Sequence, residues 1–309
     1  MLEIFRPLVT ALVDHPRLTA LLAALFIAAS GVIYRFADVT ADTATFFRAF
    51  YGLPLLAAVA LLEMRRSRPL SIKARLLSVV AGAFFALDLF FWHHAIDAVG
   101  AGMATVLGNL QVVIVAIAAW LIFGERPTRR TLAALPIILA GVVLIAGVIG
   151  AGTYGIDPPL GVLLGVLTAI AYAAYLLIIR PINRTRTAEP VAIATASTAG
   201  VALALGLGTG QLNLIPSWPE HGWLVLLGVT AQSVAYLLIS ISLPRLPAVT
   251  TSIILLGQPV AAIFLAMLLV GESPSVAQLT GVGLVIAGIA MATFPLARLR
   301  RRAMPVTTP

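Results

Sequence analysis

The feature that most constrains the fold is a series of long apolar stretches separated by short charged segments. A bilayer core about 30 Å thick takes about 20 apolar residues per helix, and these stretches have that length. The chain is 61% hydrophobic and only 10% charged, whereas about a quarter of the residues in soluble domains are charged. The stretches lack the alternation over about ten residues that is typical of β-barrels. The sequence therefore predicts an all-α integral membrane protein.

We predict ten transmembrane helices, and only two of them enclose a charged side chain. These residues are Arg48 in the second predicted helix and Asp88 in the third. Charges inside a membrane are costly, so both residues become candidates for a functional site. The predicted ranges are 18–36, 44–63, 74–96, 98–123, 131–150, 159–180, 190–211, 222–243, 246–270 and 276–297.

Positive charge is distributed unevenly over the predicted loops. Of the 20 Lys and Arg residues, all but Arg35 and Arg48 fall on the side that holds both chain ends. Because cytoplasmic loops are enriched in Lys and Arg, we predict that both termini are cytoplasmic. The net charge of +8 is then an orientation signal, and we expect no nucleic-acid partner. We expect a multi-pass protein of the bacterial inner membrane, surrounded by lipid.

Two segments share one layout at an offset of 147 residues, "QVVIVAIAAWLIFGERP" at 111–127 and "QPVAAIFLAMLLVGESP" at 258–274. Each begins with Gln and reaches a Gly-Glu-x-Pro corner thirteen residues later. The offset makes the chain two copies of a five-helix unit, and an odd number of helices inverts the second copy. Inverted repeats are typical of secondary transporters, which bind substrate near the midplane. The predicted divisions are an N-terminal segment 1–17, a first repeat 18–150, an inverted second repeat 151–297 and a basic tail 298–309.

The repeated glutamines are the first candidates for substrate binding. Thirteen residues of helix measure about 20 Å, so Gln111 and Gln258 are expected on either side of the midplane. Gly257 and Pro259 predict a kink or break in the ninth helix, since Pro lacks a backbone N–H. Asn109 marks the matching level of the fourth helix. The alternative is that each Gln only hydrogen-bonds a neighbouring helix.

Charged and titratable side chains offer further alternatives. Asp88 could hold a substrate ammonium group or a coupling proton, or it could pair with Arg48 or Arg35 and gate the outer vestibule. His93 and His94 could shuttle protons, or could lie at headgroup depth as interface anchors. The sequence leaves these interpretations open.

Polar and aromatic side chains also recur at helical spacing in several predicted helices. Buried hydroxyl groups need partners, which suits a small polar solute in a cavity. Packing between helices is the alternative for each of them. Besides the residues above, the predicted substrate-binding side chains are Ser30, Trp92, Tyr172, Tyr175, Gln232 and Tyr236.

The second half of the chain resembles EamA-type carriers of the drug/metabolite transporter superfamily. The resemblance rests on "GVTAQSVAYLLISISLPRLPAVTTSIILLGQPVAAIFLAMLLVGESPSVAQLTGVGLVIAGI" and, in the first half, on "FFRAF", "VGAGMATVLGNLQVV" and "GERP". Val112 departs from the family, where many members have Pro. The resemblance implies ten helices around a central cavity and small metabolites as substrates, and it is closest to the exporters of amino acids, including aromatic ones.

The sequence thus predicts a secondary carrier that exports neutral or hydrophobic amino acids or similar small metabolites. A phosphate-bearing substrate would need Lys or Arg deep in the cavity, and we place none near the midplane. A multidrug efflux carrier is the alternative within the same fold. An intramembrane enzyme is disfavoured because no nucleophile–base or metal motif occurs. We expect no cofactor and no metal, and both a monomer and a homodimer remain open.

Overall fold

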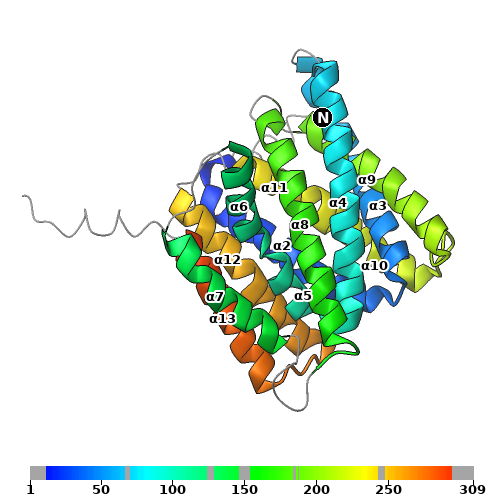
Figure 1. Cartoon of the computed structure of the whole chain (residues 1–309). Coiled ribbons are helices and arrows are strands. Elements are labelled where there is room, and N and C mark those ends of the chain that lie inside the picture. Colours follow the sequence, from blue (N-terminus) through cyan, green and yellow to red (C-terminus); the bar gives the residue numbers. More distant parts are fainter. Residues whose placement is uncertain are drawn as a thin grey trace, which may run out of the picture.

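The computed structural model describes residues 12–66, 70–123, 129–145, 154–183, 186, 188–242 and 248–293. Within these ranges all regular structure is helical and no strand occurs. Figure 1 shows the helices packed side by side in one bundle, with α8 and α4 adjacent along most of their length. The all-α class is confirmed. Most of segment 1–17 and the whole tail 298–309 lie outside the described residues.

The helical segments follow the predicted apolar stretches closely. Their bounds are α2 (Pro16–Ala37), α3 (Ala41–Arg66), α4 (Ile72–Val99), α5 (Ala101–Gly108), α6 (Gln111–Phe123), α7 (Arg129–Ile145), α8 (Pro158–Asn183), α9 (Ala188–Thr209), α10 (Trp218–Leu227), the π-helix η1 (Gly228–Val234), α11 (Ala235–Ser242), α12 (Ala248–Leu265), the π-helix η3 (Ala266–Val270) and α13 (Val276–Thr293).

Six helical segments of the described chain are long and apolar enough to cross a membrane. They are Pro16–Ala37, Ala41–Arg65, Ile72–Val99, Pro158–Ile179, Ala188–Thr209 and Trp218–Ile239. Shorter apolar helices cover the remaining predicted stretches, at Ala101–Val115, Leu132–Ile145, Gly257–Val270 and Val276–Met291. The chain is therefore a multi-pass membrane protein, and the count of ten spans stays a prediction.

Irregular backbone was expected at one level of the fourth and ninth predicted helices, and the structure has it at that level of the fourth. α12 is continuous with Pro259 inside it, so the break expected at Gly257 and Pro259 is not found. Proline removes one hydrogen bond, but the turns on either side keep theirs, and membrane helices tolerate such losses. α3 likewise continues through Pro54. An interruption is present at the matching level of the fourth predicted helix, where Asn109 and Leu110 separate α5 from α6.

Small residues bring several helices close together. A Cβ on Gly82 of α4 would collide with the carbonyl oxygen of Ala194 on α9. Gly141 of α7 lies against Gly281 of α13, where an added Cβ would be 2.6 Å from the carbonyl oxygen of Gly281. Close approach of this kind stabilises helix pairs in a bilayer, because lipid offers no hydrophobic driving force between helices.

The helix pairs form a regular pattern. α4 packs against α8 and α9, and the segment made of α10, η1 and α11 packs against α2 and α3. α3 also packs against α9, α5 against α12, and α7 against α13. Most of these contacts therefore join helices from different halves of the chain.

Five connections meet at one end of the bundle, which we call the Gly100 end. Residues 38–40, 100, 154–157, 210–217 and 271–275 lie there. Its central contact is a carboxylate cap at the first turn of α5. One carboxylate oxygen of Glu272 accepts the backbone N–H of Ala101 at 2.6 Å, and the other accepts that of Gly102 at 3.3 Å.

Further hydrogen bonds tie the connections of the Gly100 end to one another. The Gln278 side chain accepts the backbone N–H of Tyr154 and donates to its carbonyl oxygen, both at 2.8 Å. Thr40 donates to the carbonyl oxygen of Gln211 at 2.7 Å, and Thr209 donates to Asp42. Polar groups of the loops are thus largely paired at this end.

Candidate substrate-binding cavity

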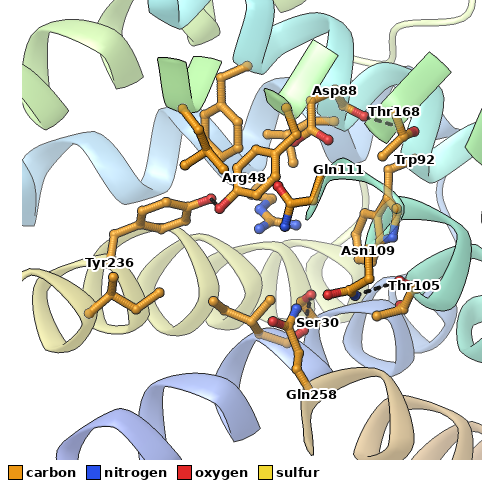
Figure 2. A pocket seen from close by; sticks show the side chains of 17 residues that line it. Ser30, Arg48, Asp88, Trp92, Thr105, Asn109, Gln111, Thr168, Tyr236 and Gln258 are labelled. Atoms are coloured by element: carbon orange, nitrogen blue, oxygen red, sulfur yellow. Dashed lines mark hydrogen bonds between the residues drawn. The ribbon is translucent and has the colours of Figure 1, made fainter. Parts of the chain in front are cut away.

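A cavity of about 300 Å³ lies in the middle of the bundle, among helices of both halves of the chain. Figure 2 shows its polar lining residues, which point into a common space. The lining comes from α2, α3, α4, the α5–α6 region, α8, α11 and α12. The lining residues are Ile27, Ser30, Arg48, Phe85, Asp88, Leu89, Trp92, Thr105, Gly108, Asn109, Gln111, Thr168, Tyr172, Leu176, Tyr236, Ile239 and Gln258.

Arg48, which the sequence placed inside the second helix as a candidate for a gate, is a cavity residue. Its side chain is 3% exposed and lines the cavity. The guanidinium carbon lies 5.4 Å from the centre of the Trp92 ring, in a cation–π contact. Within the described residues no hydrogen bond or ion pair reaches the guanidinium, and its Nε is buried without a partner. The expectation of no deep Arg or Lys is therefore wrong.

Asp88 lies in the same wall, one turn before Trp92 on α4. Asp88 is 7% exposed. Its backbone carbonyl oxygen accepts a hydrogen bond from the Thr168 hydroxyl at 3.5 Å. Among the described residues no ion pair joins Asp88 to Arg48 or to Arg35. The pairing that we considered from the sequence is thus absent: Arg48 is held over Trp92, and Arg35 is exposed on α2.

The interruption between α5 and α6 places amide groups at the cavity. The Asn109 side chain donates to the carbonyl oxygen of Thr105 at 2.8 Å. Its backbone N–H donates to the carbonyl oxygens of both Thr105 and Val106. Gln111 begins α6, and its side-chain oxygen is buried without a hydrogen-bond partner. Gln258 reaches the cavity from α12. Both repeated glutamines therefore line one cavity, and their role in binding stays a prediction.

Aromatic rings form the opposite side of the cavity. The hydroxyl of Tyr236 donates to that of Tyr172 across 3.5 Å, and both side chains line the cavity. Phe85 packs edge-on against Tyr236, with ring centres 5.4 Å apart. This wall is apolar apart from the two hydroxyl groups, so it suits the hydrocarbon part of a small solute.

Several predicted residues do not line the cavity. Tyr175 is buried behind the wall, stacked on Phe85 with ring centres 4.7 Å apart. Gln232 is fully buried in η1 and donates to the Thr195 hydroxyl at 3.1 Å. Helical spacing predicted the correct helix for both residues, but their side chains lie on a face of that helix that points away from the cavity. Arg35, Gly257 and Pro259 are also absent from the lining.

Some lining residues were not predicted from the sequence. Thr105 lies one turn before Asn109 on the same face of the chain, and Phe85 lies one turn before Asp88 and Leu89. Helical spacing from a residue already chosen would have found each of them. Apolar lining residues otherwise carry no signal that separates them from packing residues.

The two histidines follow Trp92 on α4, toward the Gly100 end, and only His93 is fully buried. His93 is fully buried, with Nδ1 hydrogen-bonded to the Thr45 hydroxyl at 2.8 Å. His94 lies 3.7 Å from the Asp42 carboxylate. His93 therefore does not act as an anchor at the membrane interface, because its side chain has no exposed surface. No group of three or more potential metal ligands occurs within the described residues.

A packed layer separates the cavity from the Gly100 end. It consists of side chains that follow the lining residues toward that end, and each is at most 2% exposed. They are Tyr34, His93, Ile96, Val99 and Met103. These side chains are packed between the cavity and the hydrogen-bonded connections of the Gly100 end.

Comparison with known families agrees with this architecture. A model of the EamA-like transporter family matches residues 17–147 and 159–294. The chain belongs to the EamA-like transporter family. As an EamA-like transporter it is a membrane transport protein, and the two matched ranges together cover most of the chain, including every residue that lines the cavity.

Solved structures agree on the fold alone. One, described only as the crystal structure of a protein, is similar with a TM-score of 0.64 and 20% sequence identity. The match covers 94% of this chain and 98% of the other. A comparison with curated proteins gives no match. These findings establish the family and leave the substrate to be argued from the cavity.

Proposed function

We propose that this EamA-like transporter is a secondary carrier that exports neutral or hydrophobic amino acids, or similar small metabolites, by alternating access. The observation that carries the proposal is a central cavity lined by both halves of the chain. Substrate sites of inverted-repeat transporters lie at such a junction. The lining combines an apolar wall with a few polar groups, as small-molecule sites generally do.

The packing pattern supports two related halves. If each helix of the first half has its counterpart 147 residues later, α4 corresponds to the α10–η1–α11 segment and α2 corresponds to α8. The contacts of α4 with α8 and α9 then correspond to those of the α10–η1–α11 segment with α2 and α3. A two-fold axis in the membrane plane would give this pattern, and rocking of one half against the other would open the cavity to alternate sides.

The closed side supports the same cycle. The predicted orientation puts the Gly100 end outside the cell, so the described state would be closed outward. Opening it would separate Glu272 from the first turn of α5 and Thr40 from the carbonyl oxygen of Gln211. These contacts join the two halves, and their rupture would accompany release of an exported solute.

Counterflow in proteoliposomes tests the transport activity. Vesicles are loaded with one unlabelled solute, and entry of labelled solute is followed across a panel of amino acids, sugars and hydrophobic cations. The expected result is saturable exchange of neutral amino acids above the level of empty vesicles. Exchange confined to hydrophobic cations would replace this proposal with multidrug efflux.

A cross-linking experiment tests alternating access. The chain contains no Cys, so a Thr40→Cys, Gln211→Cys pair can be joined by a short, cleavable bifunctional thiol reagent without background reaction. Exchange should stop when the pair is joined and return when the linker is cleaved. Each single-Cys variant, treated identically, serves as control and should keep its activity. Undiminished exchange in the joined protein would contradict movement at the Gly100 end.

A further inference from the structure

Two opposite charges face one cavity without contacting each other. Arg48 and Asp88 both line it, and they are 3% and 7% exposed. Within the described residues neither side chain takes part in an ion pair, and the Nε of Arg48 is buried without a hydrogen-bond partner. Burying an unpaired ion costs several kcal/mol even after relaxation, so a pair of such groups in one space calls for a ligand.

The geometry of Arg48 indicates what kind of group it binds. One face of the guanidinium is covered by the Trp92 ring, which leaves the in-plane N–H donors to be satisfied. A guanidinium carries five donors and no acceptor, in a fork that matches a carboxylate with two parallel hydrogen bonds. The buried oxygen of Gln111 has no partner either. An acceptor-only ligand would satisfy Arg48, whereas the oxygen of Gln111 needs a donor.

Asp88 offers the complementary chemistry. An ionised carboxylate only accepts hydrogen bonds, and this one lies on α4 facing the same cavity as Arg48 on α3. An anion alone would leave Asp88 unsatisfied, and a cation alone would leave Arg48 unsatisfied. A ligand that carries both charges satisfies the two residues at once.

We infer that the cavity binds a free zwitterion, with the carboxylate on Arg48 and the ammonium group on Asp88. The Gln111 oxygen accepts a further N–H of the ammonium group. The hydrocarbon part of the ligand contacts the apolar lining formed by Ile27, Phe85, Leu89, Leu176 and Ile239. This inference rests on the proposed carrier function and narrows it, because amines, esters and simple carboxylic acids are then poor ligands.

Binding is tested with a series of phenyl-bearing probes that differ in which of the two charged groups they carry. The probes are L-phenylalanine, L-phenylalanine methyl ester, N-acetyl-L-phenylalanine, 2-phenylethylamine and 3-phenylpropanoate. Ligand binding to the purified protein raises its unfolding temperature in a concentration-dependent way. We expect L-phenylalanine to bind at least tenfold more tightly than each of the other four. Equal binding of the ester or the amine would overturn the inference.

Reciprocal variants test the two assignments. Arg48→Gln should weaken L-phenylalanine binding at least tenfold and leave 2-phenylethylamine binding unchanged. Asp88→Asn should weaken L-phenylalanine binding and leave 3-phenylpropanoate binding unchanged. Arg48→Lys keeps the positive charge but lacks the planar guanidinium group. Its affinity for L-phenylalanine should lie between those of the wild type and Arg48→Gln. The matched controls, Arg35→Gln and Asp38→Asn, alter exposed residues outside the lining and should bind like wild type.

Binding and transport are read separately, so the two proposals can fail separately. If the zwitterion binds selectively and exchanges in no direction, the ligand assignment stands and the carrier proposal falls. If amino acids exchange but the ester and the amine compete as well as L-phenylalanine, the carrier proposal stands and the zwitterion assignment falls. If Arg48→Gln does not fold, the zwitterion assignment is still tested by the probe series on the wild type and by L-phenylalanine binding to Arg48→Lys.

Discussion

The cavity and the Gly100 end both bury polar groups, but the central carboxylate and amide of the Gly100 end are paired, whereas a guanidinium and an amide oxygen of the cavity are not. At that end Glu272 accepts two backbone N–H groups, and Gln278 both accepts from Tyr154 and donates to it. In the cavity Arg48 has no hydrogen-bond partner, and neither does the side-chain oxygen of Gln111. Both regions are built from the same helices, so the difference reflects what each is for.

Satisfied buried groups contribute to stability, whereas unsatisfied ones reduce it until a ligand arrives. The Gly100 end therefore holds the two halves together, and the cavity keeps its polar groups available. Replacing a residue in one region should change stability, and replacing one in the other should change binding. Four experiments test this separation.

The largest expected effect is on transport by Arg48→Gln. Loss of a charge-assisted contact of about 3 kcal/mol corresponds to about a hundredfold loss in exchange. The unfolding temperature without ligand should stay equal or rise, because an unpaired buried charge is removed. A marked loss of thermal stability with exchange unchanged would mean that Arg48 is a structural residue.

Glu272→Ala should show the opposite behaviour. Its removal leaves two buried N–H groups of α5 without acceptors, at a cost of about 2–3 kcal/mol in the free energy of unfolding. Thermal unfolding in detergent measures this loss. The preference for L-phenylalanine over its ester should not change, and a changed preference would couple the cap to the ligand directly.

One substitution can be compared in both regions. Gln111→Leu should weaken binding about fivefold, since about 1 kcal/mol of hydrogen bonding to the ligand is lost, and should leave the stability of the ligand-free protein equal or raise it. Gln278→Leu should lower the free energy of unfolding by about 2 kcal/mol and leave ligand preference unaffected. Titration of L-phenylalanine and thermal unfolding are measured on both variants, and a similar outcome for both would remove the distinction between the regions.

The smallest expected effect is on the pH dependence of stability. Burial raises the pKa of Glu272 above its ordinary value, and the N–H groups of Ala101 and Gly102 oppose the rise. The folded state then holds this proton more firmly, so stability should fall as the pH rises from 4.5 through the raised pKa. The difference between wild type and Glu272→Gln isolates this dependence. A difference of opposite slope would show that the cap favours the ionised form overall.

Much of the fold could be predicted because it depends on apolar length. The described helices follow the predicted stretches within a few residues. The repeat also placed Gln111 and Gln258 at one cavity, since two related halves put equivalent residues at related depths. Local backbone irregularity was less predictable. Pro259 marks only a missing donor, and whether the chain breaks there depends on the neighbouring turns.

The sequence also did not predict how deep a side chain lies along its helix, or which way the helix faces. The second helix was expected to begin at residue 44, but α3 begins at Ala41 and places Arg48 about 10 Å inside. The helix thus begins three residues earlier than predicted, and Arg48 lies deeper along it than the predicted bounds implied. Gln232 was assigned to the cavity by spacing, but the rotation of η1 is set by close packing against Gly52, where an added Cβ would lie 2.6 Å from Gln232. The rotation of η1 about its axis cannot be predicted from the spacing of residues in the sequence.

The most direct test is a structure determined with saturating L-phenylalanine. The account predicts the ligand carboxylate about 3 Å from the guanidinium nitrogens of Arg48 and the ammonium group at the same distance from Asp88. An empty cavity in which Arg48 and Asp88 contact each other directly would contradict it, because the two charges would then satisfy one another and need no ligand.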